Sequence, residues 1–279
     1  MTSDGVELVA HELGGSGGIA LLAHATGFHG TVFIPLARHL EDEFRSVAPD
    51  LRGHGRSGAP ADLDFDWSGF GLDVLAIVDA VAPRSVASPR PVGIGHSLGG
   101  TALLLAEATR PGTFAALYCY EPILVSGEHR QARGTSHPMG DAARRRRAAF
   151  ASREEARARF ASRPPLDALD PEVLDHYVID GFRDHADGTV HLRCEPENEG
   201  RIFDAGVASA VVDGLRGITC PVILGRGSRS TGLSAEGVEL ARERLGDASI
   251  VTIGGVGHFG PLEDPAAVAA SVREALSAN

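Results

Sequence analysis

The chain contains 279 residues, 43% of them hydrophobic, which is enough to bury the core of one large α/β domain or of two small ones. Its formal net charge of −11 argues against a nucleic-acid partner, because binding to a phosphate backbone needs a basic surface. The sequence contains no lysine, so Schiff-base chemistry and P-loop phosphate binding are excluded. A small-molecule substrate is the expected partner, and we expect a monomer or a homodimer.

The sequence also predicts no association with a membrane. Its first residues lack the basic and apolar regions of a signal peptide, and no apolar run approaches the roughly 18–20 residues that span a bilayer. Cys119, Cys194 and Cys220 are widely spaced and form no CxxC or ligand-spaced cluster, so we expect buried, reduced thiols rather than disulfides or a metal site. A soluble, cytoplasmic protein is therefore expected.

Strands and helices alternate along the first part of the chain. Alternation over residues 7–13 and an apolar run over residues 19–23, joined by a glycine-rich turn, predict two strands that pair as an N-terminal hairpin. Further strands are predicted at residues 45–49, 91–95 and 114–120, and helices at 67–81 and 98–109. Strands separated by helices of this length predict an α/β fold, with a mostly parallel sheet covered by helices on both faces.

The pattern changes between residues 123 and 213. This segment is rich in charged residues and helix formers, with helices predicted over 142–161 and 171–182, and we interpret it as a helical cap inserted into the α/β core. The four arginines at 144–147 would point around most of a helix, so a solvated cap face is favoured over an anion clamp. The core then comprises residues 1–122 and 214–279, with its last elements predicted at 222–224, 234–245, 249–253 and 265–278.

A candidate nucleophile lies where the strand at 91–95 meets the helix at 98–109. Residues 95–99 read Gly-His-Ser-Leu-Gly, the G-x-S-x-G pattern of a strand-to-helix turn that lifts a serine hydroxyl above the sheet. Such a turn leaves no room for side chains on its flanks, which accounts for Gly95 and Gly99. Ser97 is therefore the predicted nucleophile, and the backbone N–H of Leu98 is one predicted donor of an oxyanion hole.

Two further loops contribute to this predicted site. Residues 22–28 end a strand in a loop that contains a glycine, where the N–H of Thr26 would be the second oxyanion donor. His258 lies in a glycine-rich loop after the last predicted strand and before the last helix. This position favours a general base over a structural histidine.

These segments together resemble the α/β-hydrolase superfamily, and the resemblance covers essentially the whole chain. It is carried by residues 24–28, 49–57, 95–100 and 257–265. The resemblance implies the α/β-hydrolase fold and a structural role for the loop at 50–57. Many members have His-Gly in the oxyanion loop, and His24-Ala25 is a small departure that would narrow the turn.

The acid of the expected triad is missing from its usual place. In many members of the superfamily it follows the strand that corresponds to residues 222–224, and that position is Ser230 here. Glu121 is the alternative, because it ends the strand after the nucleophile's helix, at the sheet edge where catalytic groups gather. Some haloalkane dehalogenases and lactone hydrolases are similar in placing the acid there. Pro122 is expected to hold Glu121 in extended backbone, and Glu236 is the reserve candidate.

The predicted reaction is hydrolysis of a carboxylic ester or lactone of a small to medium, largely apolar molecule through an acyl-enzyme. His258 would take the Ser97 proton and Glu121 would orient His258, without a metal or an organic cofactor. The residues expected to line the substrate pocket are Phe28, His96, Ile123, Tyr177 and Phe259. Hydrolysis of a thioester or a carbon–carbon bond, acyl transfer to an alcohol or amine, and a catalytically silent binding protein of the same fold all stay open.

Overall fold

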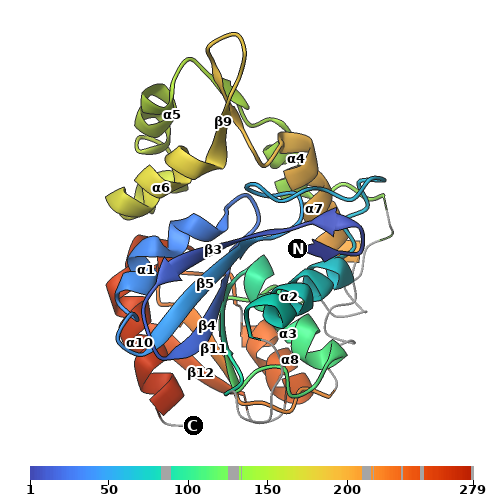
Figure 1. Cartoon of the computed structure of the whole chain (residues 1–279), viewed down its shortest axis with the longest axis vertical. Helices are drawn as coiled ribbons and strands as arrows, with labels where there is room; N and C mark the ends of the chain where they lie inside the picture. Colours follow the sequence, from blue (N-terminus) through green and yellow to red (C-terminus); the bar gives the residue numbers. More distant parts are fainter. Residues whose placement is uncertain are drawn as a thin grey trace.

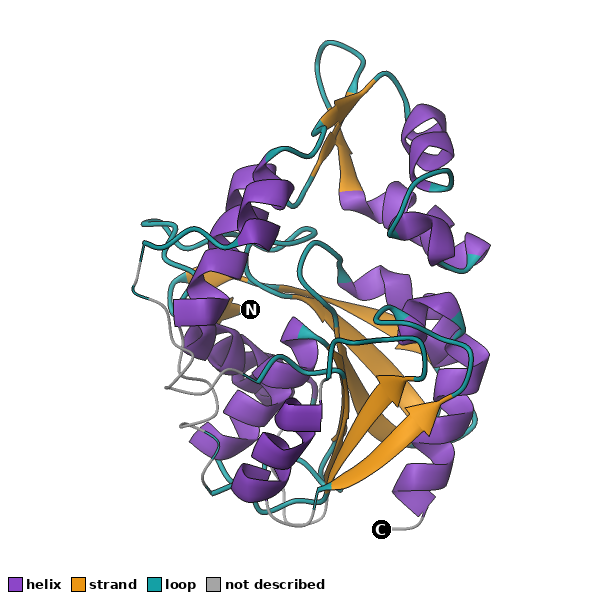
Figure 2. Cartoon of the chain, turned by 180° about the vertical axis from the view of Figure 1, so that it is seen from behind, coloured by secondary structure: helices purple, strands orange, loops and turns teal. Residues whose placement is uncertain are grey.

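The computed structural model describes residues 1–82, 89–124, 132, 134–208, 215, 217–233, 235–245 and 248–277. At its centre is a seven-stranded sheet in the order β12-β11-β7-β6-β4-β5-β3 (Figures 1 and 2). The strands are β3 (Val9–Gly14), β4 (Gly18–Ala23), β5 (Phe44–Asp50), β6 (Val92–His96), β7 (Ala116–Tyr120), β11 (Val222–Gly227) and β12 (Ser249–Ile253). Neighbouring strands are parallel except for β3 and β5, so the predicted α/β fold with a mostly parallel sheet is confirmed.

Helices cover both faces of this sheet (Figure 1). One face carries α2 (Trp67–Val81), α3 (Leu98–Thr109) and α8 (Ala235–Leu245), and the other carries α1 (Ile34–Arg38) and α10 (Pro265–Ser277). Successive strand residues point to opposite faces, so Leu21 and Leu224 join the core under α2 and α3, whereas Leu22 and Ile223 join the core against α1 and α10. Burial on both faces is the reason that these strands read as unbroken apolar runs.

The predicted N-terminal hairpin is wrong. β3 pairs antiparallel with β5, and β5 lies between β3 and β4 in the sheet. Gly15 and Gly17, in the link between β3 and β4, have positive φ. A Cβ at Gly15 would lie 2.1 Å from the carbonyl oxygen of Phe44, and a Cβ at Gly17 would lie 2.4 Å from the carbonyl oxygen of Glu43. These glycines let the chain pass close to the start of β5, and they do not form a two-residue turn.

The segment between β7 and β11 forms a layer over the strand ends, at the top of Figure 1. Its helices are α4 (Pro138–Arg144), α5 (Arg153–Phe160), α6 (Pro171–Gly181), α7 (Pro196–Ala208) and the 3-10 turn η3 (Leu166–Ala168). A small antiparallel sheet in the order β8-β10-β9 joins them, from β8 (Ala149–Phe150), β10 (Val190–Leu192) and β9 (Phe182–Asp184). The expected boundary between the cap and the second part of the core, at residues 213 and 214, lies outside the described residues.

The helix predicted over 142–161 is in fact two helices. α4 ends at Arg144, so the next three arginines of the run at 144–147 lie beyond it, and β8 follows. α5 then starts at Arg153, where the side chain of Ser152 accepts a hydrogen bond from the N–H of Glu155. The Ser-x-x-Glu spacing at 152–155 is a sequence signal for a new helix start. α7 was not predicted from the sequence.

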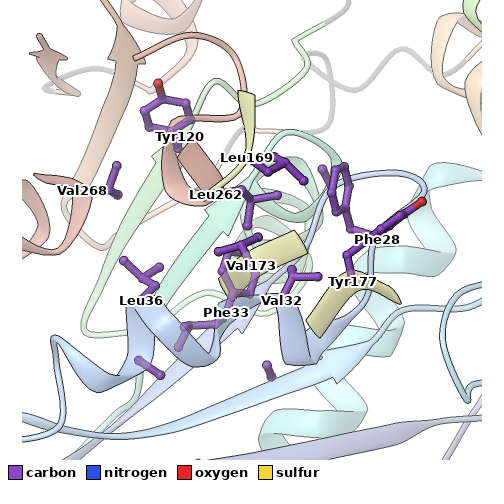
Figure 3. Close-up of a cluster of buried hydrophobic side chains, with 14 of the residues drawn as sticks. Phe28, Val32, Phe33, Leu36, Tyr120, Leu169, Val173, Tyr177, Leu262 and Val268 are labelled. Atoms are coloured by element: carbon purple, nitrogen blue, oxygen red, sulfur yellow. The ribbon is translucent and has the colours of Figure 1, made fainter. Parts of the chain in front are cut away.

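Apolar contacts join α6 to the core. Val173 and Tyr177 of α6 belong to the same buried cluster as Val32 and Leu36 of η1 (Gly30–Phe33) and α1, and Figure 3 shows these side chains gathered together. At one end of this cluster the rings of Phe28 and Tyr177 approach to 5.2 Å between centroids. The inserted layer is therefore held close to the loop that follows β4.

The remaining elements are short: β1 (Thr2–Ser3), β2 (Val6–Glu7) and α9 (Gly260–Glu263). Cys119, Cys194 and Cys220 are buried and unpaired, as predicted. Across the described ranges, none of the helices has the length and apolar character required to cross a bilayer.

Candidate active site

Ser97 occupies a strained turn between β6 and α3. Its backbone has φ 52° and ψ −117°, outside the regions that residues with a side chain prefer, while the N–H of Ser97 donates to the carbonyl of Tyr120 over 2.9 Å. A Cβ at Gly99 would lie 2.0 Å from the carbonyl oxygen of Ala23, and a Cβ at Gly95 would lie 2.6 Å from the backbone of Gly100. The two glycines thus permit the close approach of β4, β6 and α3 that produces the turn.

His258 lies in the loop between β12 and α9, and two buried side chains fix this loop. The hydroxyl of Tyr120 donates to the carbonyl of Gly257 over 2.6 Å, and Nε2 of His96 donates to the carbonyl of His258 over 2.8 Å. Burial, with the nearby charge of His258, lowers the pKa of His96 well below its ordinary value, so His96 stays neutral. The imidazole of His258 itself is 33% exposed and reaches the cavity described below.

The carboxylate of Glu121 lies against His258. Oε2 of Glu121 accepts a hydrogen bond from Nδ1 of His258 over 2.7 Å and another from Oγ of Ser230 over 2.6 Å, while Oε1 accepts from the N–H of Gly227 over 2.9 Å. Burial raises the pKa of Glu121, but these three hydrogen bonds and the charge of His258 outweigh that effect and leave the pKa below its ordinary value. The fully buried carboxylate is therefore ionised at neutral pH.

The expectation of extended backbone at Glu121 is wrong. Its φ is +43°, in the left-handed region, so Pro122 does not hold it in a strand-like conformation. β7 ends at Tyr120, and the N–H of Glu121 still donates to the carbonyl of Gly225 on β11 over 2.8 Å. The left-handed turn ends the strand directly before Glu121, so Glu121 and Ser97 are both residues with strained backbone.

Thr26 and Leu98 flank Ser97 from two elements. Thr26 follows the end of β4 and lines the cavity, and Leu98 begins α3, a helix of 12 residues whose N-terminus points its free N–H groups at this site. His24 and Ala25 occupy the positions where His-Gly was expected. Nδ1 of His24 donates to the carbonyl of Ala25 over 2.8 Å, and Nε2 accepts from the N–H of Leu51 over 3.0 Å. His24 thus holds the loop in shape from beneath, buried and away from the cavity.

The cavity in front of Ser97 has a volume of about 470 Å³ and lies between the core and the inserted layer. Of the residues expected to line it, Phe28, Tyr177 and Phe259 do so, together with Ser97 and His258. His96 and Ile123 do not: His96 is fully buried behind His258, and the backbone of Ile123 is hydrogen-bonded to Thr101 at the start of α3. Apolar side chains from the inserted layer complete the wall: Met139, Phe150, Phe160, Leu166 and Phe203.

Sequence reasoning missed the charged side chains of this cavity. Its lining includes Arg145, Arg146, Arg147, Arg159, Arg163 and Glu199. The run of arginines at 144–147 is visible in the sequence. Which of its side chains face the cavity depends on where α4 ends and on α7, which supplies Glu199, the ion-pair partner of Arg146. The reserve acid Glu236 lies on α8, and its side chain is outside the described part of the structure.

A metal could be held at a different place. Ligand atoms of His185, Asp187 and His191 lie within 4.8 Å of one another on the hairpin formed by β9 and β10. None of the three residues lines the cavity in front of Ser97. The carboxylate of Asp187 already accepts a hydrogen bond from the N–H of Thr189 over 2.9 Å.

Comparisons with known proteins identify the family to which this chain belongs. Residues 20–271 match the sequence model of the Alpha/beta hydrolase family. The chain therefore belongs to that family, and with it to the α/β-hydrolase superfamily of hydrolases.

Three relatives illustrate the similarity. The chain is 25% identical over 257 residues to a 2-(acetamidomethylene)succinate hydrolase of Mesorhizobium japonicum, covering 88% of this chain and 83% of the relative. It is 27% identical over 270 residues to a pimeloyl-(acyl-carrier protein) methyl ester esterase of Xanthomonas campestris pv. campestris, covering 88% of this chain and 89% of the relative. The solved enol-lactonase from Burkholderia xenovorans has a similar fold, with a TM-score of 0.70 and 20% identity over 99% of this chain and 98% of that one.

Proposed function

We propose that this protein is a serine hydrolase that cleaves a carboxylic ester or lactone through an acyl-enzyme intermediate, with Ser97 as nucleophile, His258 as general base and Glu121 as the acid. One observation carries the proposal. The buried, ionised Glu121 binds Nδ1 of His258 over 2.7 Å, and that leaves Nε2 for the cavity that His258 shares with Ser97. The strained turn at Ser97 supports the same assignment.

Acylation follows from these positions. His258 Nε2 takes the proton of the Ser97 hydroxyl as its oxygen attacks the substrate carbonyl carbon, and the carbonyl electron pair moves onto the oxygen. The N–H groups of Leu98 and Thr26 would hold this oxyanion, and removing one such donor typically costs about 3–4 kcal/mol of barrier. When the intermediate collapses, the proton on His258 passes to the departing alkoxide.

Deacylation repeats these steps with water. His258 removes a proton from the water that attacks the acyl-enzyme, and the second intermediate returns Ser97 and releases the carboxylic acid. In a lactone the leaving alkoxide stays attached to the acyl group, so a single hydroxy acid is released. Glu121 remains ionised throughout and stabilises the imidazolium that forms twice in the cycle.

The names of the relatives support ester chemistry. One is a methyl ester esterase, and a solved structure of similar fold is an enol-lactonase. The alternative of a catalytically silent binding protein was supported by the lack of a carboxylate at Ser230. That support is weaker because Ser230 donates a hydrogen bond to the carboxylate of Glu121. Thioester and carbon–carbon bond hydrolysis would use the same three side chains and belong in the substrate panel that accompanies the test.

Covalent labelling by a fluorophosphonate, followed by intact mass, tests the proposal without knowledge of the substrate. We expect labelling at Ser97 in the unmodified chain, none in Ser97→Ala, and a labelling rate lower by about 10⁴-fold in Glu121→Gln. Far-ultraviolet circular dichroism on each variant checks that the fold persists. Equal labelling of Glu121→Gln would remove Glu121 from the mechanism, and no labelling together with no hydrolysis in an ester, lactone and thioester panel would overturn the proposed function.

A further inference from the structure

The cavity at Ser97 concentrates positive charge in a protein whose net charge is −11. Five arginines line it: Arg145, Arg146, Arg147, Arg159 and Arg163. Glu199 is the sole carboxylate among its described lining residues. A cavity with this imbalance has a positive potential, which attracts anions and repels cations.

Two of the five arginines are already neutralised by protein carboxylates. Arg146 is ion-paired with Glu199 and donates to the hydroxyl of Tyr177 over 2.7 Å. Arg147 donates through both terminal nitrogens to Glu155, over 2.7 and 3.1 Å, and its guanidinium lies 4.3 Å from the centroid of the Phe150 ring. These two side chains form part of the cavity wall and are engaged in holding it together.

Among the residues that the structure describes, no carboxylate forms an ion pair with the other three arginines, and only Glu155 interacts electrostatically with one of them, Arg159. Within the described ranges, neither a hydrogen bond nor an ion pair involves the guanidinium of Arg145, Arg159 or Arg163. Five other arginines of the inserted layer are matched with carboxylates, whereas Arg193 donates to the carbonyl of Phe182. The pairs are Arg144–Glu197, Arg153–Asp184, Arg157–Asp175, Arg183–Glu195 and Arg201–Glu197.

The position of the unpaired charges defines the shape of a ligand. Ser97, His258 and the Phe28 and Phe259 rings lie on the core side of the cavity. Arg145 lies directly after α4, and Arg159 and Arg163 lie at the end of α5 and just beyond it, all in the inserted layer. Arg145 and Arg163 are exposed and Arg159 is half-buried, so all three guanidinium groups are accessible from solvent.

We infer that the substrate carries an anionic oxygen group, a carboxylate or a phosphate, which ion-pairs with Arg145, Arg159 and Arg163 while its ester carbonyl meets Ser97. The inference rests on the proposed function and narrows it, since a wholly apolar ester would leave these charges unused. Guanidinium groups bind both anions through paired N–H donors, so carboxylate and phosphate share this chemistry. The apolar side chains that line the same cavity would contact the stem that joins the ester to the anion.

Two matched pairs of substrates test the inference and distinguish the sources of the anion. Mono-p-nitrophenyl glutarate and p-nitrophenyl pentanoate have acyl chains of equal length and differ in a terminal carboxylate. The pentanoyl thioesters of phosphopantetheine and pantetheine differ in a phosphate on the leaving group. We expect kcat/KM for the charged member of at least one pair to exceed that of its neutral partner by about 10- to 100-fold. Preference in the first pair assigns the arginines to a carboxylate, and preference in the second assigns them to a phosphate.

Variants connect the preference to the three side chains. Arg159→Gln should reduce the charged-to-neutral ratio of kcat/KM about tenfold, and the triple variant of Arg145, Arg159 and Arg163 to Gln should bring it close to one. Arg242→Gln is the matched control, because Arg242 is an exposed arginine of α8 outside the cavity, and it should leave the ratio unchanged. High salt should also lower the ratio.

Failure of the inference is distinguishable from failure of the proposed function. If a fluorophosphonate labels Ser97 but neither pair shows a preference for its charged member, the inference is wrong and the hydrolase stands. A preference that survives in the triple variant would equally overturn it. Absence of both labelling and hydrolysis would overturn the proposed function, and the inference would fall with it.

Discussion

Ser230 donates its hydroxyl to Oε2 of Glu121 over 2.6 Å, and the same carboxylate oxygen accepts from Nδ1 of His258. Ser230 stands at the position where the acid was expected from the sequence, and here its hydroxyl supports the carboxylate of Glu121, the acid that we propose, from the neighbouring strand. β7 and β11 are adjacent and parallel, with Tyr120 opposite Gly225, and this pairing brings Glu121 and the loop after β11 to the same sheet edge. A carboxylate from either strand can reach His258.

Ser230→Ala should weaken this support without removing the acid. Loss of one hydrogen bond to an ionised group costs about 1.5–3 kcal/mol, so kcat should fall by roughly 10- to 100-fold while KM changes little. Ester hydrolysis, measured beside Glu121→Gln, checks the ranking: the serine variant should be the milder of the two. Wild-type kcat in Ser230→Ala would mean that Glu121 needs no help from this hydroxyl.

Gly232→Ala should disrupt the pair formed by Glu121 and His258. A Cβ at Gly232 would lie 2.3 Å from Oε2 of Glu121 and 2.9 Å from Nδ1 of His258, so one of them must move. A displacement near 1 Å in a reacting group can cost about 10²-fold, and we expect a loss of kcat of that size. Gly254→Ala is the control, because no atom lies within 4 Å of its added Cβ, and it should retain activity. Similar activity in the two variants would contradict the prediction.

Tyr120→Phe should loosen the His258 loop. The mutation leaves the carbonyl of Gly257 without the hydrogen bond that it accepts from Tyr120 over 2.6 Å, which should lower the free energy of unfolding by about 1–3 kcal/mol and kcat about tenfold. Tyr118, on the same strand, donates to or accepts from Oγ of Ser271 over 2.8 Å, at α10. Tyr118→Phe should therefore reduce stability but not kcat. Urea unfolding and ester hydrolysis on both variants separate the two effects.

Acid should destabilise the fold through two buried histidines. Burial, with a contribution from the nearby His54, lowers the pKa of His24 from 6.5 to about 3, and burial lowers the pKa of His54 from 6.5 to about 4. The rings of these two histidines are in edge contact, with centroids 4.9 Å apart. Between pH 6.5 and pH 4 the unfolded chain binds protons that the folded chain does not, so stability is complete above pH 6.5 and falls as the pH is lowered.

The expected slope is about 1.4 kcal/mol per pH unit for each of these histidines. Free energies of unfolding from urea titrations at several pH values between 7 and 4 measure it. His54→Gln should reduce the slope by the share of one histidine, whereas His39→Gln, at an exposed position, should leave it unchanged. An identical slope in His54→Gln and the unmodified chain would show that His54 is not a source of the acid sensitivity.

Features that depend on local sterics could be predicted from the sequence. The helices at 67–81 and 98–109 agree with α2 and α3, because apolar periodicity and the turn before Ser97 are local properties of the chain. The tight turn at Ser97 requires glycine on both sides, and this requirement is visible in a sequence of five residues. Glu121 could be singled out for a similar reason, since the end of a parallel strand marks the functional edge of the sheet.

Long-range packing determined the rest. Gly15 and Gly17 indicate a turn in the sequence, yet only the insertion of β5 between β3 and β4 explains them. The left-handed backbone of Glu121 and its hydrogen bond from Ser230 need β7 and β11 side by side. The positions of Arg145, Arg159 and Arg163 likewise depend on where α4 and α5 end above the strand edge. From the sequence, charged residues of this kind predict a solvated surface. The elements packed around them make that surface a cavity wall.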